Sequence, residues 1–194
     1  MILSKGLSQL STDMGSRLPF EIVVSTPVAM EALWSALCDD RQLADLPYKV
    51  ETNERGQLFM SPADTPHSRW QARLAVGLGG AIEAARLGGE VLIGCAVLTA
   101  QGVKVPDVAW VSEQAWLTRA NQSLLLVAPT ICIEVMSPSN STVEMADKAA
   151  LYFAHGAREV WILEETVRVR FYDPRGSIAR SAIVPDFPSA LERR

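Results

Sequence analysis

The chain has 194 residues, 48% of them hydrophobic, and a formal net charge of −4. A chain of this length and composition can bury one sizeable core, so we predict a single domain over residues 1–194. The acidic balance argues against a protein that holds a long stretch of nucleic acid on a wide basic surface, although it does not exclude cleavage. No run of about 18 apolar residues occurs, which predicts that no segment spans a membrane.

The first 47 residues are expected to form a mostly helical extension in front of a core at 48–175. In the segment TPVAMEALWSALCDD, Thr26 is a suitable N-cap and Pro27 a suitable first helical residue. The tail at 176–194 contains the proline-broken segment SAIVPDFPSALERR. Its apolar residues are expected to cover a sheet edge or a partner subunit.

A long stretch with helical periodicity, RWQARLAVGLGGAIEAARLGG, follows Pro66 and His67 and predicts the first core helix. His67 has two interpretations at this stage. It can donate a hydrogen bond to a phosphate or a metal-bound water, or it simply stands at the start of the helix, where Ser68 is a suitable cap.

The next segment, GGEVLIGCAVLTAQG, predicts a strand bounded by glycines, followed by a turn at Gln101-Gly102. The run VKVPDVAWV then returns as the second strand of a hairpin. Pro106 is tolerable only where no ladder donor is needed, such as a strand start. Asp107 is therefore expected near a strand end, where a cleft can open, although alone it could also begin a turn after its proline.

The run TICIEVMS predicts a further strand with a glutamate in its middle. Because side chains alternate between the two faces, Glu134 and Met136 point away from the face that carries Ile131 and Ile133. A carboxylate inside an apolar strand is costly to bury unless a metal ion or another cation compensates its charge. Together with Asp107 on a neighbouring strand, Glu134 predicts a metal site.

The segment SPSNSTVEMADKAALYFAHGA predicts a turn and then a helix. Ser141 and Glu144 fit a capping box, and Gly156 can end the helix in a left-handed conformation. Glu144, Lys148 and Tyr152 repeat every four residues and so share one helical face. On spacing alone, Lys148 forms an exposed ion pair with Glu144 of small energetic value. The following run, REVWILEE, predicts another apolar strand.

The cysteines, Cys38, Cys95 and Cys132, are odd in number and far apart in sequence. We expect them to be reduced and buried, as fits a cytoplasmic protein. Zinc would need ligands at short spacing, and two distant histidines do not provide them. Basic residues gather late in the chain, where Arg168 and Arg170 share one face of a strand. We expect this face to meet solvent, and contact with a nucleic-acid backbone is the alternative.

Taken together, PDVAWV, ICIEVMSPSN, the helix with Lys148 and LYFAHGAREVWIL resemble the Uma restriction-endonuclease family within the PD-(D/E)XK nuclease superfamily. The resemblance runs from Val50 to Tyr172 and includes His67 and the upstream segment VETNERGQLFMSP. It implies an α/β, restriction-endonuclease-like core of helix, three strands, helix and strand with a mixed sheet, preceded by the N-terminal helical extension.

The resemblance also implies which residues act. Asp107 and Glu134 match the metal-binding pair, and the carbonyl of Val135 is expected to complete the shell of a Mg²⁺ ion, with Mn²⁺ as a substitute. Met136 stands where the superfamily usually has a lysine. Lys148, on the following helix, matches the position thought to take its place and is expected to orient the water or stabilise charge on the phosphate.

We therefore predict a hydrolase, a magnesium-dependent endonuclease that cleaves phosphodiester bonds in nucleic acid, with DNA as the expected substrate and a homodimer as the assembly that the resemblance implies. Glu51, which matches an upstream family glutamate, and His67 are expected to contribute beside the metal. Two alternatives stay open. One is a catalytically silent nucleic-acid-binding or structural module, favoured by Met136 and the acidic charge, and the other a metal-dependent hydrolase of small phosphorylated substrates.

Overall fold

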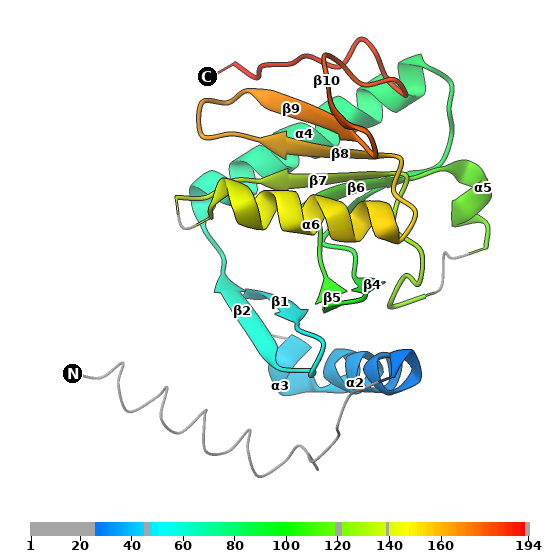
Figure 1. The fold of residues 1–194 in the computed structure, drawn as a ribbon, viewed down its shortest axis with the longest axis vertical. Helices are drawn as coiled ribbons and strands as arrows, with labels where there is room; N and C mark the ends of the chain where they lie inside the picture. The colour runs from blue at the N-terminus through cyan, green and yellow to red at the C-terminus, as the bar shows by residue number, and fades with distance from the viewer. Residues whose placement is uncertain (1–25, 45–46, 119–121, 139, 193–194) are drawn as a thin grey trace.

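A mixed six-stranded sheet forms the centre of the computed structural model, which describes residues 26–44, 47–118, 122–138 and 140–192 (Figure 1). In sheet order its strands are β10 (Gly176–Ile178), β9 (Val169–Asp173), β8 (Glu159–Leu163), β7 (Ile131–Val135), β6 (Val108–Val111) and β3 (Glu90–Ile93). β7 and β8 run parallel, and the other neighbouring strands run antiparallel. The predicted α/β fold with a mixed sheet is confirmed.

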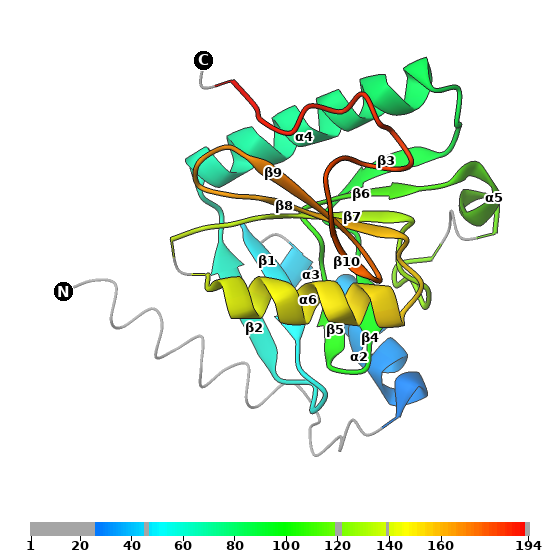
Figure 2. The ribbon, with the colours of Figure 1, turned by 45° about the horizontal axis from the view of Figure 1, so that its top comes forward.

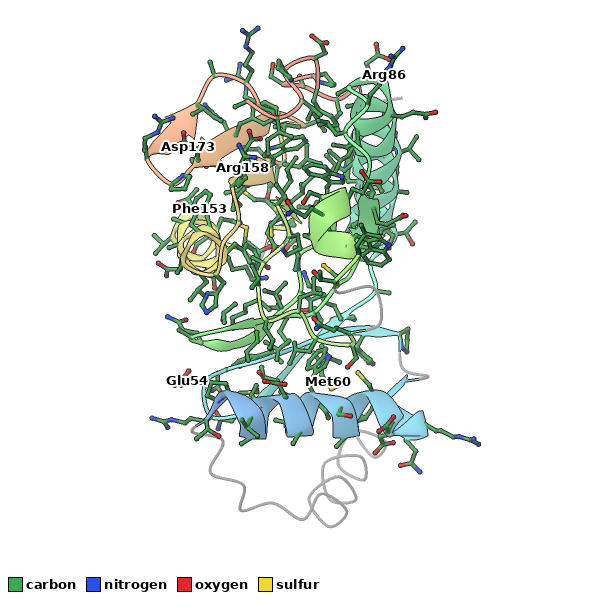
Figure 3. All side chains as sticks on the ribbon, turned by 90° about the vertical axis from the view of Figure 1, so that its right-hand side faces the viewer. Glu54, Met60, Arg86, Phe153, Arg158 and Asp173 are labelled. Atoms are coloured by element: carbon green, nitrogen blue, oxygen red, sulfur yellow. The ribbon has the colours of Figure 1, made fainter. Side chains whose placement is uncertain are left out.

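Two helices cover the faces of this sheet, α4 (Thr65–Ala84) on one side and α6 (Thr142–Ala154) on the other (Figures 1 and 2). Figure 3 shows the layers edge on, with Phe153 of α6 and Arg86, just beyond α4, on opposite sides. Alternation along β7 fixes this arrangement, because Ile131 and Ile133 pack in the cluster with α4 whereas Cys132 packs in the cluster with α6. The order α4, β3, β6, β7, α6, β8 is the predicted core of helix, three strands, helix and strand.

The helix starts follow from capping. The capping box of α6 is present in both halves, and Gly156 after the helix has φ 103°, as predicted. α4 begins earlier than expected, because the side chain of Asp64 caps it by accepting from the backbone N–H of His67 at 3.2 Å. Ser68, named as a suitable cap, lies inside the helix instead.

The predicted hairpin that leads to Asp107 is divided into two nested strand pairs, with β4 and β5 lying between β3 and β6 in the chain. β3 pairs with β6, while β4 (Val97–Thr99) and β5 (Gly102–Lys104) pair with each other as a separate ribbon. The chain bends at Gly94, whose φ of 68° is readily adopted by glycine, and bends back before Pro106, which lacks a ladder donor. Asp107 therefore stands at the bend that leads into β6, and α5 (Glu113–Trp116) follows that strand.

A smaller hydrophobic cluster lies beside the sheet. It joins α2 (Pro27–Asp39), α3 (Arg41–Ala44), the hairpin of β1 (Tyr48–Thr52) and β2 (Leu58–Pro62), and the β4–β5 ribbon (Figure 1). α2 starts as predicted, with the Thr26 hydroxyl accepting from the backbone N–H of Ala29 at 3.2 Å. The rest of the predicted N-terminal extension, residues 1–25, lies outside the described part of the chain. This cluster sets β1 beside the entrance to β6.

The C-terminal tail packs onto the chain's own core. Val184 and Phe187 are buried, and the ring of Phe187 lies 4.7 Å from that of Trp161, centroid to centroid. Glu159 of β8 anchors the tail, because its buried carboxylate accepts from the hydroxyl of Ser181 and from backbone N–H groups that follow it. The buried apolar residues of the tail thus pack against β8, an interior strand of their own sheet, whereas the prediction placed them at a sheet edge or on a partner subunit.

All three cysteines are free, with Cys132 buried and Cys95 half-buried. Cys38 is exposed near the end of α2, so the expectation that all three are buried is wrong there. In the described part of the chain, no helix combines the length and hydrophobicity needed to cross a bilayer.

Candidate active site

A cleft of about 1200 Å³ opens where β7 ends and α4 and α6 begin, with the β1–β2 hairpin as its far wall. The five side chains predicted to act all line it: Glu51, His67, Asp107, Glu134 and Lys148. They come from β1, α4, the start of β6, β7 and α6. The structure therefore brings together residues that lie up to 97 positions apart, as in the contact between Glu51 and Lys148.

Asp107 and Glu134 meet because of the strand register. β6 and β7 are antiparallel with Val108 opposite Ile133, so one further step of the register places Asp107 opposite Glu134 on the same face. Both carboxylates are almost fully buried, with side-chain exposures of 1% and 4%. Two carboxylates at this depth need cations or hydrogen-bond donors around them.

Asp107 has four donors. Its Oδ1 lies 2.8 Å from Nζ of Lys49, 3.0 Å from Nε2 of Gln71 and 3.1 Å from Nε2 of His67, and its Oδ2 accepts from the backbone N–H of Val135 at 2.8 Å. Burial alone would raise the pKa of Asp107, but the hydrogen bond from His67 and the charge of Lys49 outweigh it and hold the pKa well below its usual range. Asp107 is therefore ionised at neutral pH.

The negative charge of Glu134 is compensated less completely than that of Asp107. Its Oε1 accepts from the hydroxyl of Tyr152 at 2.6 Å and lies 3.5 Å from Nζ of Lys148, while its Oε2 lies 3.6 Å from Nζ of Lys49. Burial raises the pKa of Glu134, and the two lysines offset only part of that rise. The two carboxylates of the site thus differ in their affinity for a proton, which is typical of functional sites.

Lys148 reaches across the cleft from α6 to β1. Its Nζ lies 2.9 Å from Oε1 of Glu51, which also accepts from the backbone N–H of Val105 at 3.0 Å. Burial would raise the pKa of Glu51, but the charges of Lys148 and Lys49 lower it below its usual value. The interpretation of Lys148 as an exposed partner of Glu144 is wrong, because its ammonium points into the site.

Lys49, which carries no role in the predictions from sequence, lies between the two metal-site candidates. Its ammonium contacts Asp107 at 2.8 Å and Glu134 at 3.6 Å, and lies 3.9 Å from Glu51. Although burial lowers the pKa of Lys49, the surrounding carboxylates raise it above its ordinary range. The strand period offered a signal, because Lys49 stands two residues before Glu51 on β1 and so shares its face.

Val135 is the last residue of β7 and Met136 follows it, and the two residues differ in whether they line the cleft. Met136 donates its backbone N–H to the carbonyl of Leu163 and does not line the cleft, so the position that usually carries the superfamily lysine lies outside the described cleft lining. Val135 does line the cleft, and its N–H holds Asp107. A role for its carbonyl as a metal ligand stays a prediction.

The charge of the cleft is strongly uneven. Six carboxylates line it against three lysines, and none of the described lining residues is an arginine. The chain has only four lysines, so most of them are placed here. Arg168 and Arg170, expected to meet solvent by default, are both exposed and do not line the cleft, and Arg170 pairs with Glu164.

The donor set fits a hard divalent ion, because Asp107 and Glu134 present carboxylate oxygens around a position that a cation already fills. Among the described residues, no group of three or more His, Cys, Asp or Glu is arranged to hold a metal by side chains alone. An ion here would therefore take the remaining ligands from backbone carbonyl, water or substrate, which is the usual pattern for Mg²⁺.

Comparison with known proteins gives a family and a fold. Residues 40–190 match the Uma2 family, described as "Putative restriction endonuclease". No curated protein matches the sequence. A crystal structure of a "putative nuclease belonging to DUF820" from Anabaena variabilis ATCC 29413 superposes with a TM-score of 0.60 at 16% identity, covering 73% of this chain and 86% of that one. At that identity the likeness shows the fold alone.

Proposed function

The chain belongs to the Uma2 family of restriction-endonuclease-like proteins, and from that premise we propose that it is a divalent-metal-dependent endonuclease. The proposed reaction is hydrolysis of phosphodiester bonds in nucleic acid, with DNA as the proposed substrate and Mg²⁺ or Mn²⁺ as the cofactor. We also propose a homodimer, from the family resemblance, and a cytoplasmic location, from the free cysteines.

One observation carries this proposal. Asp107 and Glu134, held on neighbouring strands, surround a single cation inside a cleft that also receives the ammonium of Lys148. Phosphodiester hydrolysis needs oxygen ligands for a metal ion and a fixed positive charge near the phosphate, and these three side chains supply both.

Asp107 and Glu134 would hold the ion, with the carbonyl of Val135 as a further ligand. When bound, the ion supplies a water of lowered pKa and neutralises charge on the phosphate. The lowered pKa of Asp107 keeps that ligand ionised and ready to bind. Gln71 and the backbone N–H of Val135 keep its two oxygens in a fixed orientation.

Lys148 is proposed to stabilise the negative charge that develops on the phosphate. Glu51 holds the ammonium of Lys148 from the opposite wall of the cleft, which makes it a positioning residue. His67 donates from Nε2 to Oδ1 of Asp107 and so positions that carboxylate, and because it also lines the cleft it is proposed to contact the substrate phosphate.

A catalytically silent module is the second candidate, and one observation favours it. Lys49 and Lys148 already compensate the charges of the two buried carboxylates. Such a protein would bind nucleic acid or a partner with the same fold and cut nothing. Metal binding without cleavage would identify it.

The test is a cleavage assay with purified protein on supercoiled plasmid, linear duplex, single-stranded DNA and RNA, each with Mg²⁺, Mn²⁺ or chelator. Asp107→Asn serves as the matched variant, because it keeps size and shape but removes the ligand charge.

We expect metal-dependent cutting by the wild type that the variant loses. Equal cutting by both proteins would overturn the assigned site, and no cutting of any polymer by a protein that binds Mn²⁺ would favour the silent module. Cleavage of nucleotides but not polymers would point to a hydrolase of small phosphorylated substrates.

A further inference from the structure

The ammonium of Lys49 occupies the space between the two carboxylates that are proposed to hold the metal. It lies 2.8 Å from Oδ1 of Asp107 and 3.6 Å from Oε2 of Glu134. Lys49 comes from β1, a strand of the outer hairpin, whereas the carboxylates belong to the central sheet. The cation therefore reaches the site from a different element than the two carboxylates do.

The contact with Lys49 offsets the electrostatic repulsion between the two carboxylates. The side chains of Asp107 and Glu134 are almost fully buried and face each other across the β6–β7 register, so their charges repel at short range. Lys49 is the one described cation that contacts both of them, since Lys148 reaches Glu134 and Glu51 only. An ammonium and a divalent ion cannot occupy the same position, and their charges repel each other nearby.

We propose that Lys49 is a built-in counter-cation that competes with the divalent ion, and that metal binding displaces its ammonium into the cleft toward the substrate phosphate. This inference rests on the proposed function. It adds a positioning charge to the reaction, because Lys49 would then stand beside Lys148 as a second ammonium for the anionic substrate.

The surroundings of Lys49 decide where the displaced ammonium goes. On one side of Lys49 lies a cavity of about 470 Å³ walled mainly by apolar side chains, among them Trp34, Leu37 and Val105. On the other side lies the polar cleft, where Lys49 also forms part of the wall. Because a charge is poorly solvated in an apolar cavity, the cleft is the favoured destination.

The test measures Mn²⁺ binding by titration calorimetry, together with thermal unfolding in chelator and in Mn²⁺. Lys49→Met removes the charge and keeps the stem. We expect it to bind Mn²⁺ about tenfold more tightly than wild type or better, because no charged hydrogen bond must be broken first. We also expect a lower Tm in chelator and a larger rise in Tm on adding Mn²⁺.

Lys104→Met is the matched control. It removes the same charge from the same cleft, but Lys104 donates to the backbone carbonyl of Thr52 at 2.9 Å rather than to either metal-site carboxylate. Its effect on Mn²⁺ affinity should stay within about threefold, because a charge without direct contact is screened. If Lys49→Met does not fold, Lys49→Gln, which retains a donor, should give the same tightening.

The outcomes separate the two proposals. Mn²⁺ binding by wild type that Lys49→Met leaves unchanged or weakens would overturn the inference and leave the metal site standing. Equal tightening by Lys49→Met and Lys104→Met would also overturn it, because net charge alone would then explain the effect. No Mn²⁺ binding by either wild type or variant would overturn the metal site and the inference together.

Discussion

The hydroxyl of Tyr152 donates a 2.6 Å hydrogen bond to Oε1 of Glu134, which ties α6 to β7 directly beneath the candidate active site. Both side chains are buried. Burial raises the pKa of the phenol well above its usual value, and the charge of Glu134 raises it further, so Tyr152 stays a donor. The contact fixes the orientation of one proposed metal ligand.

Tyr152→Phe removes that donor and leaves the ring in place. A hydrogen bond to a charged, buried acceptor contributes about 1.5–3 kcal/mol, so we expect a loss of that order in the free energy of unfolding. Urea unfolding of the metal-free protein measures it. Tyr172→Phe on β9 is the control, expected to change stability by less than about 0.5 kcal/mol. Equal stability of wild type and Tyr152→Phe would show that the contact is not formed in solution.

Lys148→Met tests whether this lysine has replaced the usual one after β7. Loss of one fixed charge at the reacting phosphate lowers kcat by about 10²–10³-fold in comparable sites, and we expect that loss here with Mn²⁺ binding retained. Adding Met136→Lys to this variant should not restore cutting, because position 136 does not line the cleft. Restored activity in the double variant would show that the position after β7 still serves the reaction.

The ionisation of Asp107 predicts the direction in which the free energy of unfolding changes with pH. Its folded pKa lies below the ordinary value of 3.8, so its ionised form contributes stability above that value and loses it as the pH falls through the folded pKa. The free energy of unfolding of wild type minus that of Asp107→Asn should therefore be constant above about pH 5 and shrink below about pH 4. Urea unfolding across this range measures the difference, and a difference that grows on acidification contradicts the assignment.

Glu159 is a second carboxylate in an apolar strand, with a structural role. It accepts from Nε1 of Trp161, from the hydroxyl of Ser181 and from two backbone N–H groups of the tail. Glu159→Gln turns one acceptor oxygen into a donor that faces other donors, so we expect a loss of about 3 kcal/mol in stability. Glu164→Gln, at an exposed ion pair, should cost less than about 1 kcal/mol. Similar losses in both variants would refute the anchoring role.

The caps of two helices and the faces of one strand were predicted correctly from the sequence, because they depend on residues that are close together in the chain. The caps at Thr26 and Ser141 involve atoms three positions away, and the two faces of β7 follow from strand geometry alone. The family pattern added Asp107, Glu134 and Lys148 as a group, and the fold brings all three to one cleft.

The features that the sequence did not predict depend on contacts between residues far apart in the chain. Lys49 meets Asp107 from 58 positions away, and no local pattern predicts that distance. Glu159 and Glu134 look alike in sequence, yet backbone donors from the tail compensate one while lysines compensate the other. The sequence placed Gly94 inside one continuous strand, but the chain bends there. The bend carries β4 and β5 to a second hydrophobic cluster, which forms only in the folded chain and so has no local sequence pattern.

The most direct measurement compares Glu134→Gln with Glu159→Gln in Mg²⁺-dependent cleavage of DNA, at a temperature where circular dichroism shows both variants folded. Each variant neutralises one buried carboxylate on neighbouring parallel strands, so the pair separates chemistry from stability. The account predicts that Glu134→Gln loses both cutting and Mn²⁺ binding, while Glu159→Gln keeps both. Metal-dependent cutting by Glu134→Gln at the wild-type rate would contradict it.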